Sequence, residues 1–166
     1  MEIKFDIDLT TKDMYKFLLN NTYRRLTGII WVIFSVIVAA VTVITWGKVE
    51  LANSVLMIIM ASLYTVINPV MLYFKAKSQV KKNETLNSTL HYVIDEEQIT
   101  VSQGELTERT KWKDIYKLVK YGKQVIVYVT SLNAFVWPLS AIGEHYNEIA
   151  EIADKAIGKR NKLKRI

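Results

Sequence analysis

Two long apolar stretches without a single charged residue constrain this chain more than any other feature of its sequence. The first runs from Leu26 to Trp46, and the second runs from Leu51 to Phe74. Because a helix rises about 1.5 Å per residue, the first stretch reaches roughly the 30 Å thickness of a bilayer's hydrocarbon core. The second stretch is long enough to tilt or to extend into the interface. We therefore predict a membrane helical hairpin, with a transmembrane helix at 26–46, a short loop at 47–50 and a transmembrane helix at 51–74.

Lysine and arginine gather at the outer ends of these two stretches. The connecting loop contains only Lys48. By the positive-inside rule, the loop is external and both termini are cytoplasmic, so the chain is predicted to be a multi-pass membrane protein. A second span follows the first at once, which argues against a cleaved signal peptide. The basic residues that flank the stretches are Lys12, Lys16, Arg24 and Arg25 on one side and Lys75, Lys77, Lys81 and Lys82 on the other.

The polar residues within the predicted spans do not support ion transport. None of them ionises, and intramembrane ionisable groups are the usual mark of an ion or proton path. A monomeric transporter is therefore disfavoured. Asn68 and Pro69 predict a local kink, whose freed carbonyl is satisfied by Thr65 or by a neighbouring helix. The polar residues are Ser35, Thr42, Ser54, Ser62, Thr65 and Asn68.

The segment before the first span, residues 1–25, is predicted to contain a strand and a helix on the cytoplasmic side. Apolar residues alternate with charged ones from Ile3 to Leu9, which is the period of a strand with one buried face. Thr10 or Thr11 can cap the following helix, with Asp13 in its first turn. Its apolar stripe is expected to pack either on the cytoplasmic module or on lipid. The stripe consists of Met14, Tyr15, Phe17 and Leu18.

A basic juxtamembrane segment at 75–84 is predicted to continue the second helix, and an α+β module is predicted at 85–158. From Thr85 to Pro138 the sequence contains six short strand-like runs separated by turn residues, which predicts an antiparallel sheet or barrel that the N-terminal strand joins. From Ile142 an amphipathic helix follows and ends at Gly158. The remaining residues, 159–166, are predicted to be a disordered basic tail.

This arrangement resembles the YcxB-like family. The similarity rests on four segments: Thr89 to Ile94, the acidic turn Asp95 to Glu97, Lys111 to Ile115, and Ala134 to Pro138. The resemblance implies a bacterial cytoplasmic-membrane protein with two spans and a module similar to pleckstrin-homology (PH) domains. It supports the architecture more than any activity. The motif residues Trp112, Asp114, Ile115, Trp137 and Pro138 are expected to be structural, with Trp112 and Ile115 in the core and Asp114 in a turn.

The sequence offers no constellation for catalysis or for a cofactor. The chain has no cysteine, and its two histidines, His91 and His145, have no further His or Cys to complete a metal site. No phosphate-binding glycine loop, nucleophile elbow or dinucleotide fingerprint is present. His145 with Glu144 and Glu148 is read as an ordinary helix surface. We therefore predict a protein that is not an enzyme and has no cofactor or metal.

Two sets of basic residues are the main candidates for ligand binding. The net charge of +6 could indicate nucleic acid, but its placement beside the apolar stretches fits a membrane surface better. The same residues would also be needed simply to set the topology. The candidate lipid-headgroup residues are Arg24, Arg25, Lys75, Lys77, Lys81 and Lys82. Lys111, Lys113, Lys117, Lys120 and Lys123 could extend this patch, with Lys111 and Lys113 on one face of their strand.

These observations lead to one functional hypothesis and one alternative. The first is a membrane-anchored binding or adaptor module that docks lipid headgroups or a protein partner. The alternative is an accessory or immunity-type subunit of a membrane complex, which would act through its transmembrane helices. The expected partners are membrane lipids, with another membrane or cytoplasmic protein, or a second copy of the chain, as further options. Nucleic acid is not an expected partner.

Overall fold

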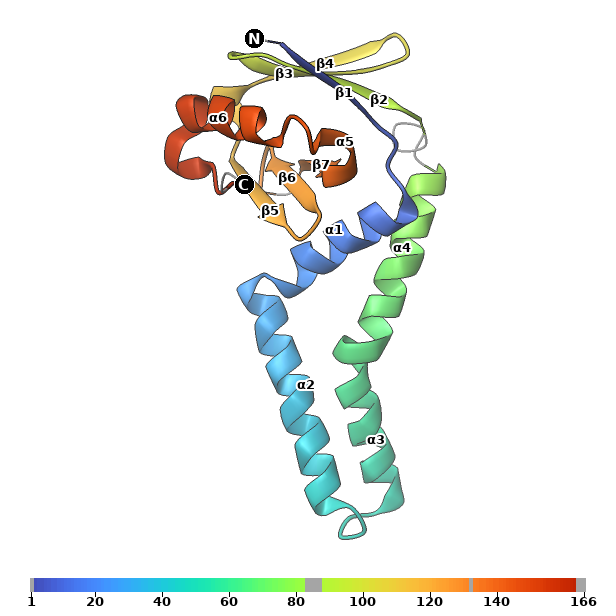
Figure 1. Cartoon of the computed structure of the whole chain (residues 1–166). Helices are drawn as coiled ribbons and strands as arrows, with labels where there is room; N and C mark the ends of the chain where they lie inside the picture. Colours follow the sequence, from blue (N-terminus) through green and yellow to red (C-terminus); the bar gives the residue numbers. More distant parts are fainter. Residues whose placement is uncertain (1, 83–87, 132, 164–166) are drawn as a thin grey trace.

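Two apolar helical segments form an elongated leg below an α+β module, and α1 (Thr11–Tyr23) lies between the leg and the module (Figure 1). The structure is a computed structural model that describes residues 2–82, 88–131 and 133–163. The predicted start of the module at Thr85 and the basic residues Lys164 and Arg165 lie outside the described residues. The leg consists of α2 (Leu26–Thr45), α3 (Leu51–Ser62), the π-helical turn η1 (Leu63–Ile67) and α4 (Asn68–Lys82).

The leg contains two helices that are long and apolar enough to cross a membrane, Leu26–Thr45 and Leu51–Lys82. In the most apolar part of the first helix, 17% of the residues are buried. In the most apolar part of the second helix, none are. Ser35, Thr42 and Ser54 are buried between the helices, while large apolar side chains point outwards. This distribution is the reverse of the one found in a water-soluble helical protein. The second helix continues through the basic residues to Lys82, and the last two residues of the predicted juxtamembrane segment 75–84 lie outside the described residues.

The π-helical turn explains how the helix accommodates Pro69. The Asn68 amide donates to Leu63 O, and Pro69 has no N–H, so neither amide serves the Tyr64 carbonyl. The hydroxyl of Tyr23, at the end of α1, donates to Tyr64 O at 2.6 Å instead. Of the two predicted partners for the freed carbonyl, the structure therefore shows the neighbouring helix. The Thr65 hydroxyl donates to Ala61 O.

Helix α1 packs against the leg and the module at the same time. It begins with the predicted cap: the Asp13 amide donates to Thr10 Oγ1, and the Thr10 amide donates to Asp13 Oδ2. Met14 and Leu18 pack against α4, at Leu72 and Ala76. Phe17 packs against both this cluster and the core of the module. The predicted apolar stripe is thus covered by protein.

The module contains two antiparallel sheets and not the closed barrel that was one of the predicted forms. The first sheet has the strand order β1-β2-β3-β4, and the second has the order β5-β6-β7. The N-terminal strand joins as predicted, with Ile3 opposite Ile94 in the β1–β2 pair. The strands are β1 (Ile3–Ile7), β2 (Leu90–Ile94), β3 (Gln98–Gln103), β4 (Leu106–Lys111), β5 (Lys117–Tyr121), β6 (Gln124–Tyr128) and β7 (Ala134–Pro138).

A short 3-10 turn, η2 (Trp112–Asp114), lies between the last strand of the first sheet and the first strand of the second. Strand β4 is mostly exposed, and η2 redirects the chain before β5 begins, so β4 and β5 belong to different sheets. Trp112 and Ile115 anchor this turn in the core, as predicted, with 2% and 0% of their surface exposed. The prediction that Lys111 and Lys113 share a strand face is wrong, because the strand ends at Lys111.

The C-terminal helices cover the core that the two sheets leave open. The amphipathic helix that was predicted from Ile142 begins later, at Tyr146, as α6 (Tyr146–Ile157). A separate short helix, α5 (Leu139–Ile142), precedes it and directly follows Pro138. Gly158, with φ +51°, ends α6 as predicted, because this backbone conformation suits a residue without a side chain.

The predicted disordered tail is ordered up to Leu163. It begins with the 3-10 turn η3 (Gly158–Arg160). The Arg160 guanidinium donates to Ile115 O at 2.6 Å, and the Asn161 side-chain amide donates to Ala150 O at 3.1 Å. Leu163 is buried in the module core. These contacts outweigh the mobility that the basic composition suggested.

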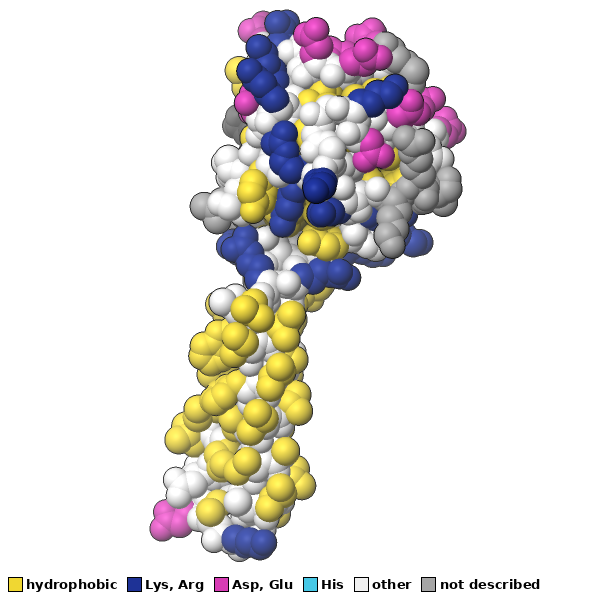
Figure 2. Space-filling view, turned by 90° about the vertical axis from the view of Figure 1, so that its left-hand side faces the viewer, with side chains coloured by type: hydrophobic (Ala, Val, Ile, Leu, Met, Phe, Trp, Pro, Cys, Tyr) yellow, Lys and Arg dark blue, Asp and Glu magenta, His cyan; other side chains and the backbone are white. Residues whose placement is uncertain are grey.

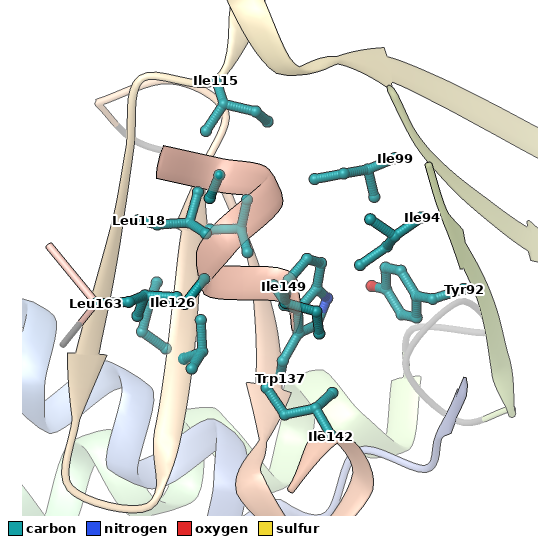
Figure 3. Close-up of a cluster of buried hydrophobic side chains, with 14 of the residues drawn as sticks. Tyr92, Ile94, Ile99, Ile115, Leu118, Ile126, Trp137, Ile142, Ile149 and Leu163 are labelled. Carbon is teal, nitrogen blue, oxygen red and sulfur yellow. The ribbon is translucent and has the colours of Figure 1, made fainter. Parts of the chain in front are cut away.

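Trp137 joins the two sheets at the centre of the core. Figure 3 shows Tyr92, Ile94 and Ile99 directed from the first sheet towards Trp137 of β7 and Ile149 of α6. The indole is fully buried and packs edge-on against Phe5 and Tyr92, with ring centroids 5.5 and 5.6 Å away. Contacts among these aromatic rings pack β1 and β2 against β7.

Tyr92 makes the stability of the module sensitive to high pH. Burial raises the pKa of its phenol, and the nearby Glu108 carboxylate adds to that effect. In the unfolded chain the phenol ionises near pH 10, while in the folded chain it stays neutral to a higher pH. The unfolded state therefore binds fewer protons above pH 10, and we expect stability to fall as the pH rises further. Urea unfolding at several pH values from 8 upwards should show this loss, and Tyr92→Phe should reduce its slope.

Candidate functional site

The corner between α1 and α2 brings two arginines against the module. Helix α1 ends at Tyr23 and α2 begins at Leu26, so Arg24 and Arg25 form the corner itself. Gly28 allows this close approach. A Cβ at Gly28 would overlap the Thr22 carbonyl oxygen and lie 2.9 Å from Tyr23 Cα.

Strands β5 and β6 of the module close this corner into a pocket of about 280 Å³, which we call the corner pocket. It contains three basic side chains, Arg24, Arg25 and Lys117, and no aspartate or glutamate. Its remaining lining is neutral and mostly aromatic or amide. The full lining is Asn20, Asn21, Arg24, Arg25, Tyr116, Lys117, Tyr121, Tyr128 and Ser131.

The three cations are held by neutral groups that leave their charge uncompensated. The Arg24 guanidinium lies 4.7 Å from the Tyr121 ring centroid, and the Lys117 ammonium lies 4.8 Å from that of Tyr128. Arg25 Nη2 donates to Asn21 Oδ1 at 3.1 Å and to Ser131 O at 3.2 Å. Within the described part of the chain, none of the three has a carboxylate at ion-pair distance.

The phenols of the corner pocket contribute neutral ring faces. Burial raises the pKa of Tyr128, and the nearby Arg25 charge partly offsets this increase. Tyr128 is therefore uncharged at neutral pH and does not cancel the positive charge. A pocket with several cations and no carboxylate can bind an anion, and guanidinium groups suit the oxygen geometry of a phosphate.

Basic side chains also gather on the surface of the molecule. In Figure 2, lysine and arginine side chains gather at the neck where the apolar leg meets the module, and they continue onto the module above it. On this face the apolar leg separates them from the charged residues at its far end. The neck is the level at which a bilayer surface would lie if the leg were inserted.

The structure divides the lysines and arginines that the sequence predicted as one headgroup set. Arg24 and Arg25 line the corner pocket together with Lys117, which was predicted only as an extension of the patch. Lys75, Lys77, Lys81 and Lys82 lie on α4, which packs along α1 and does not line this pocket. Lys120 lies over the ring of Tyr146, 4.8 Å from its centroid, and is not part of the lining.

Sequence reasoning missed the neutral part of the lining. The sequence signal for this lining is that three tyrosines lie within 11 residues of Lys117: Tyr116, Tyr121 and Tyr128. The contact between Arg25 and Ser131 joins positions 106 residues apart, and no local spacing predicts it.

The histidines do not form a second centre. His91 Nδ1 lies 2.7 Å from Asp6 Oδ1, and His145 Nδ1 lies 3.3 Å from Glu148 Oε2, both in exposed positions. No group of three or more His, Cys, Asp or Glu side chains is placed to hold a metal ion within residues 2–82, 88–131 and 133–163.

The fold and the pocket define a class of protein: an α+β module carried on two helices that are long and apolar enough to span a membrane. Residues 94–153, from the end of β2 into α6, match the model of the YcxB-like protein family. This match confirms the family resemblance for the central part of the module. No curated protein and no solved structure matches the chain.

Proposed function

We propose that this chain is a membrane-anchored, non-enzymatic binding module whose corner pocket takes the phosphate group of an anionic lipid headgroup. The observation that carries the proposal is the set of three cations, Arg24, Arg25 and Lys117, which face one pocket without a carboxylate. Such a set would strongly favour an anion over a neutral ligand.

Membrane insertion is supported by the surface of the leg. Between α2 and α3 the buried side chains Ser35, Thr42 and Ser54 are small and polar, whereas the exposed positions of the leg hold large apolar side chains, which suits an apolar solvent. The loop at the far end contains one lysine, Lys48, whereas basic residues are numerous at the neck. By the positive-inside rule, this favours a cytoplasmic module with both termini in the cytoplasm of a cell whose membrane it spans twice.

Location and charge favour a lipid as the source of the phosphate. The corner pocket lies between the start of α2 and the module, where the headgroups of the module-side leaflet would be. Helix α2 also begins at this corner, and the positive end of its dipole adds to the attraction for an anion. Each basic residue near an anionic leaflet contributes on the order of 1 kcal/mol.

We expect the triple variant Arg24→Gln, Arg25→Gln, Lys117→Gln to bind an anionic lipid about 100-fold more weakly, because three such contributions are lost and every 1.4 kcal/mol changes the affinity tenfold. The measurement is a calorimetric titration of the full chain in a neutral detergent with dioctanoyl phosphatidylglycerol. A parallel titration with inorganic phosphate shows whether the phosphate group suffices without the lipid.

The matched control is Lys75→Gln, Lys77→Gln, Lys81→Gln, which removes the same charge from α4 and leaves the corner pocket intact. A saturable affinity that falls in the pocket variant and stays within a few-fold of wild type in the control supports the proposal. Equal losses in both variants would show that only the general charge of the neck matters, and the corner pocket would not be the binding site.

A further inference from the structure

A second cavity lies within the leg, where α2 separates from the helix that faces it. It is a groove of about 340 Å³ between α2 and the helix that faces it, lined there by the end of α3, by η1 and by the start of α4. This volume falls within the range of about 300–1,000 Å³ that is usual for small-molecule pockets. The walls are mainly apolar and include Trp31, Phe34, Met60, Leu63, Ile67 and Met71.

The groove lies at the depth of a single leaflet. Trp31 and Phe34 lie about 8–12 Å along α2 from its first residue, at 1.5 Å per residue. Met71 lies about 6 Å below Lys75 on the facing helix by the same measure. Met60, nine residues or about 14 Å from Leu51 at the far end, lies near the midplane by the same measure. In a bilayer with a hydrocarbon core of about 30 Å, the groove would therefore extend from the side of the module to about the midplane.

The π-helical turn lies in the wall of this groove, and the backbone carbonyl that it leaves without an intrahelical donor is hydrogen-bonded. The Tyr64 carbonyl, which the turn and Pro69 leave without an intrahelical donor, receives the Tyr23 hydroxyl at 2.6 Å. The Asn68 side-chain amide donates to the same hydroxyl oxygen at 3.0 Å. The Tyr64 ring stacks on Trp31, with centroids 6.2 Å apart, and forms part of the lining. With these backbone and side-chain groups paired, the groove presents a mainly apolar surface.

We propose that this groove binds one acyl chain of a membrane lipid. The inference rests on the membrane insertion proposed above, and it does not depend on the anion site. Its lining argues for a flexible hydrocarbon chain over a partner helix, because closely packed transmembrane helices prefer small residues at their contact. Here the walls are aromatic rings and the flexible side chains Met60 and Met71, which adapt to an irregular apolar occupant.

The test is photocrosslinking of the full chain in nanodiscs of phosphatidylcholine that carries a diazirine within its acyl chain. Adducts are mapped by mass spectrometry. We expect adducts at Phe34 and Met71 to exceed by several-fold those at Ile33 and Val70, which have nearly the same depth, are exposed and do not line the groove. A zwitterionic lipid is used so that headgroup charge plays no part.

Filling the groove gives the decisive comparison. Leu63→Trp is expected to abolish the enrichment, whereas Val66→Trp, in the same π-helical turn but outside the lining, is expected to retain it. Met60→Phe serves as a second filling variant if Leu63→Trp does not fold.

Three other results would overturn the inference. Equal labelling of groove and control positions would mean that only surrounding lipid is in contact. Protection of the groove by a second copy of the chain, seen as a crosslinked dimer, would replace the acyl chain with a helix. An absence of adducts on both helices would refute membrane insertion, and with it the proposed function, whereas a failed anion titration would leave the acyl site standing.

Discussion

Replacing Gly28 with alanine is expected to open the corner between α1 and α2. The added Cβ would overlap the Thr22 carbonyl oxygen and approach Tyr23 Cα to 2.9 Å, and both are backbone atoms that cannot move without moving α1. Alanine is intrinsically favoured over glycine in a helix by about 1 kcal/mol. Overpacking typically costs about 1–3 kcal/mol and more where backbone must shift, so the clash should outweigh that gain.

The measurement for Gly28→Ala is thermal unfolding of the full chain in detergent, together with limited proteolysis after Arg24 and Arg25. We expect a lower melting temperature and faster cleavage at the corner. Because the corner pocket depends on this geometry, the affinity for the anionic lipid should fall as well. Ala40→Val adds bulk at an exposed position of the same helix and is the control. Unchanged cleavage and affinity in Gly28→Ala would mean that α1 tolerates the shift and that Gly28 does not define the corner.

Replacing Trp137 with alanine is expected to destabilise the module by about 3–5 kcal/mol, the range for truncating a fully buried tryptophan. The indole has no exposed surface and contacts Phe5 and Tyr92 across the gap between the sheets. Its removal would leave a cavity at the place where β1 and β2 pack on β7. Since a typical domain is stable by only about 5–15 kcal/mol, the effect should be plain in urea unfolding followed by near-ultraviolet circular dichroism.

Trp46→Ala is the matched control for this substitution. Trp46 lies at the end of α2 with 59% of its surface exposed, so the same change of side chain should leave the unfolding of the module nearly unaffected. Trp137→Phe should recover part of the stability because an aromatic ring still fills the site. Similar losses from Trp137→Ala and Trp46→Ala would contradict the assignment of Trp137 to the junction of the sheets.

Several elements of this fold could be predicted because their signals are local. The alternation from Ile3 to Leu9 specified a strand, and the pair Thr10 and Asp13 specified the start of a helix. Gly158 marked the end of α6 through a conformation that favours glycine. The length and composition of the apolar stretches predicted two long helices. Each of these signals depends on residues within a few turns of one another.

Other features could not be predicted because they depend on contacts between distant positions. The order of the tail follows from Arg160 and Asn161 reaching backbone carbonyls 45 and 11 residues away. The separation into two sheets coincides with η2, where Trp112 and Ile115 are buried between two strand-like runs that the sequence predicted to follow one another directly. Composition indicated mobility in the first case, and in the second the spacing of the strands left both a sheet and a barrel open. Tertiary packing decided both.

The sequence by itself determined that the chain has two apolar helices, an N-terminal strand, an antiparallel α+β module and a basic neck, because periodicity, length and charge are local properties. Only the tertiary structure decided which cations line one pocket. It placed Lys117 beside Arg24 and Arg25 and left the lysines of α4 outside the pocket. The physical reason is that Gly28 allows α2 to turn closely against α1, which carries the two arginines up to the β5–β6 strands of the module.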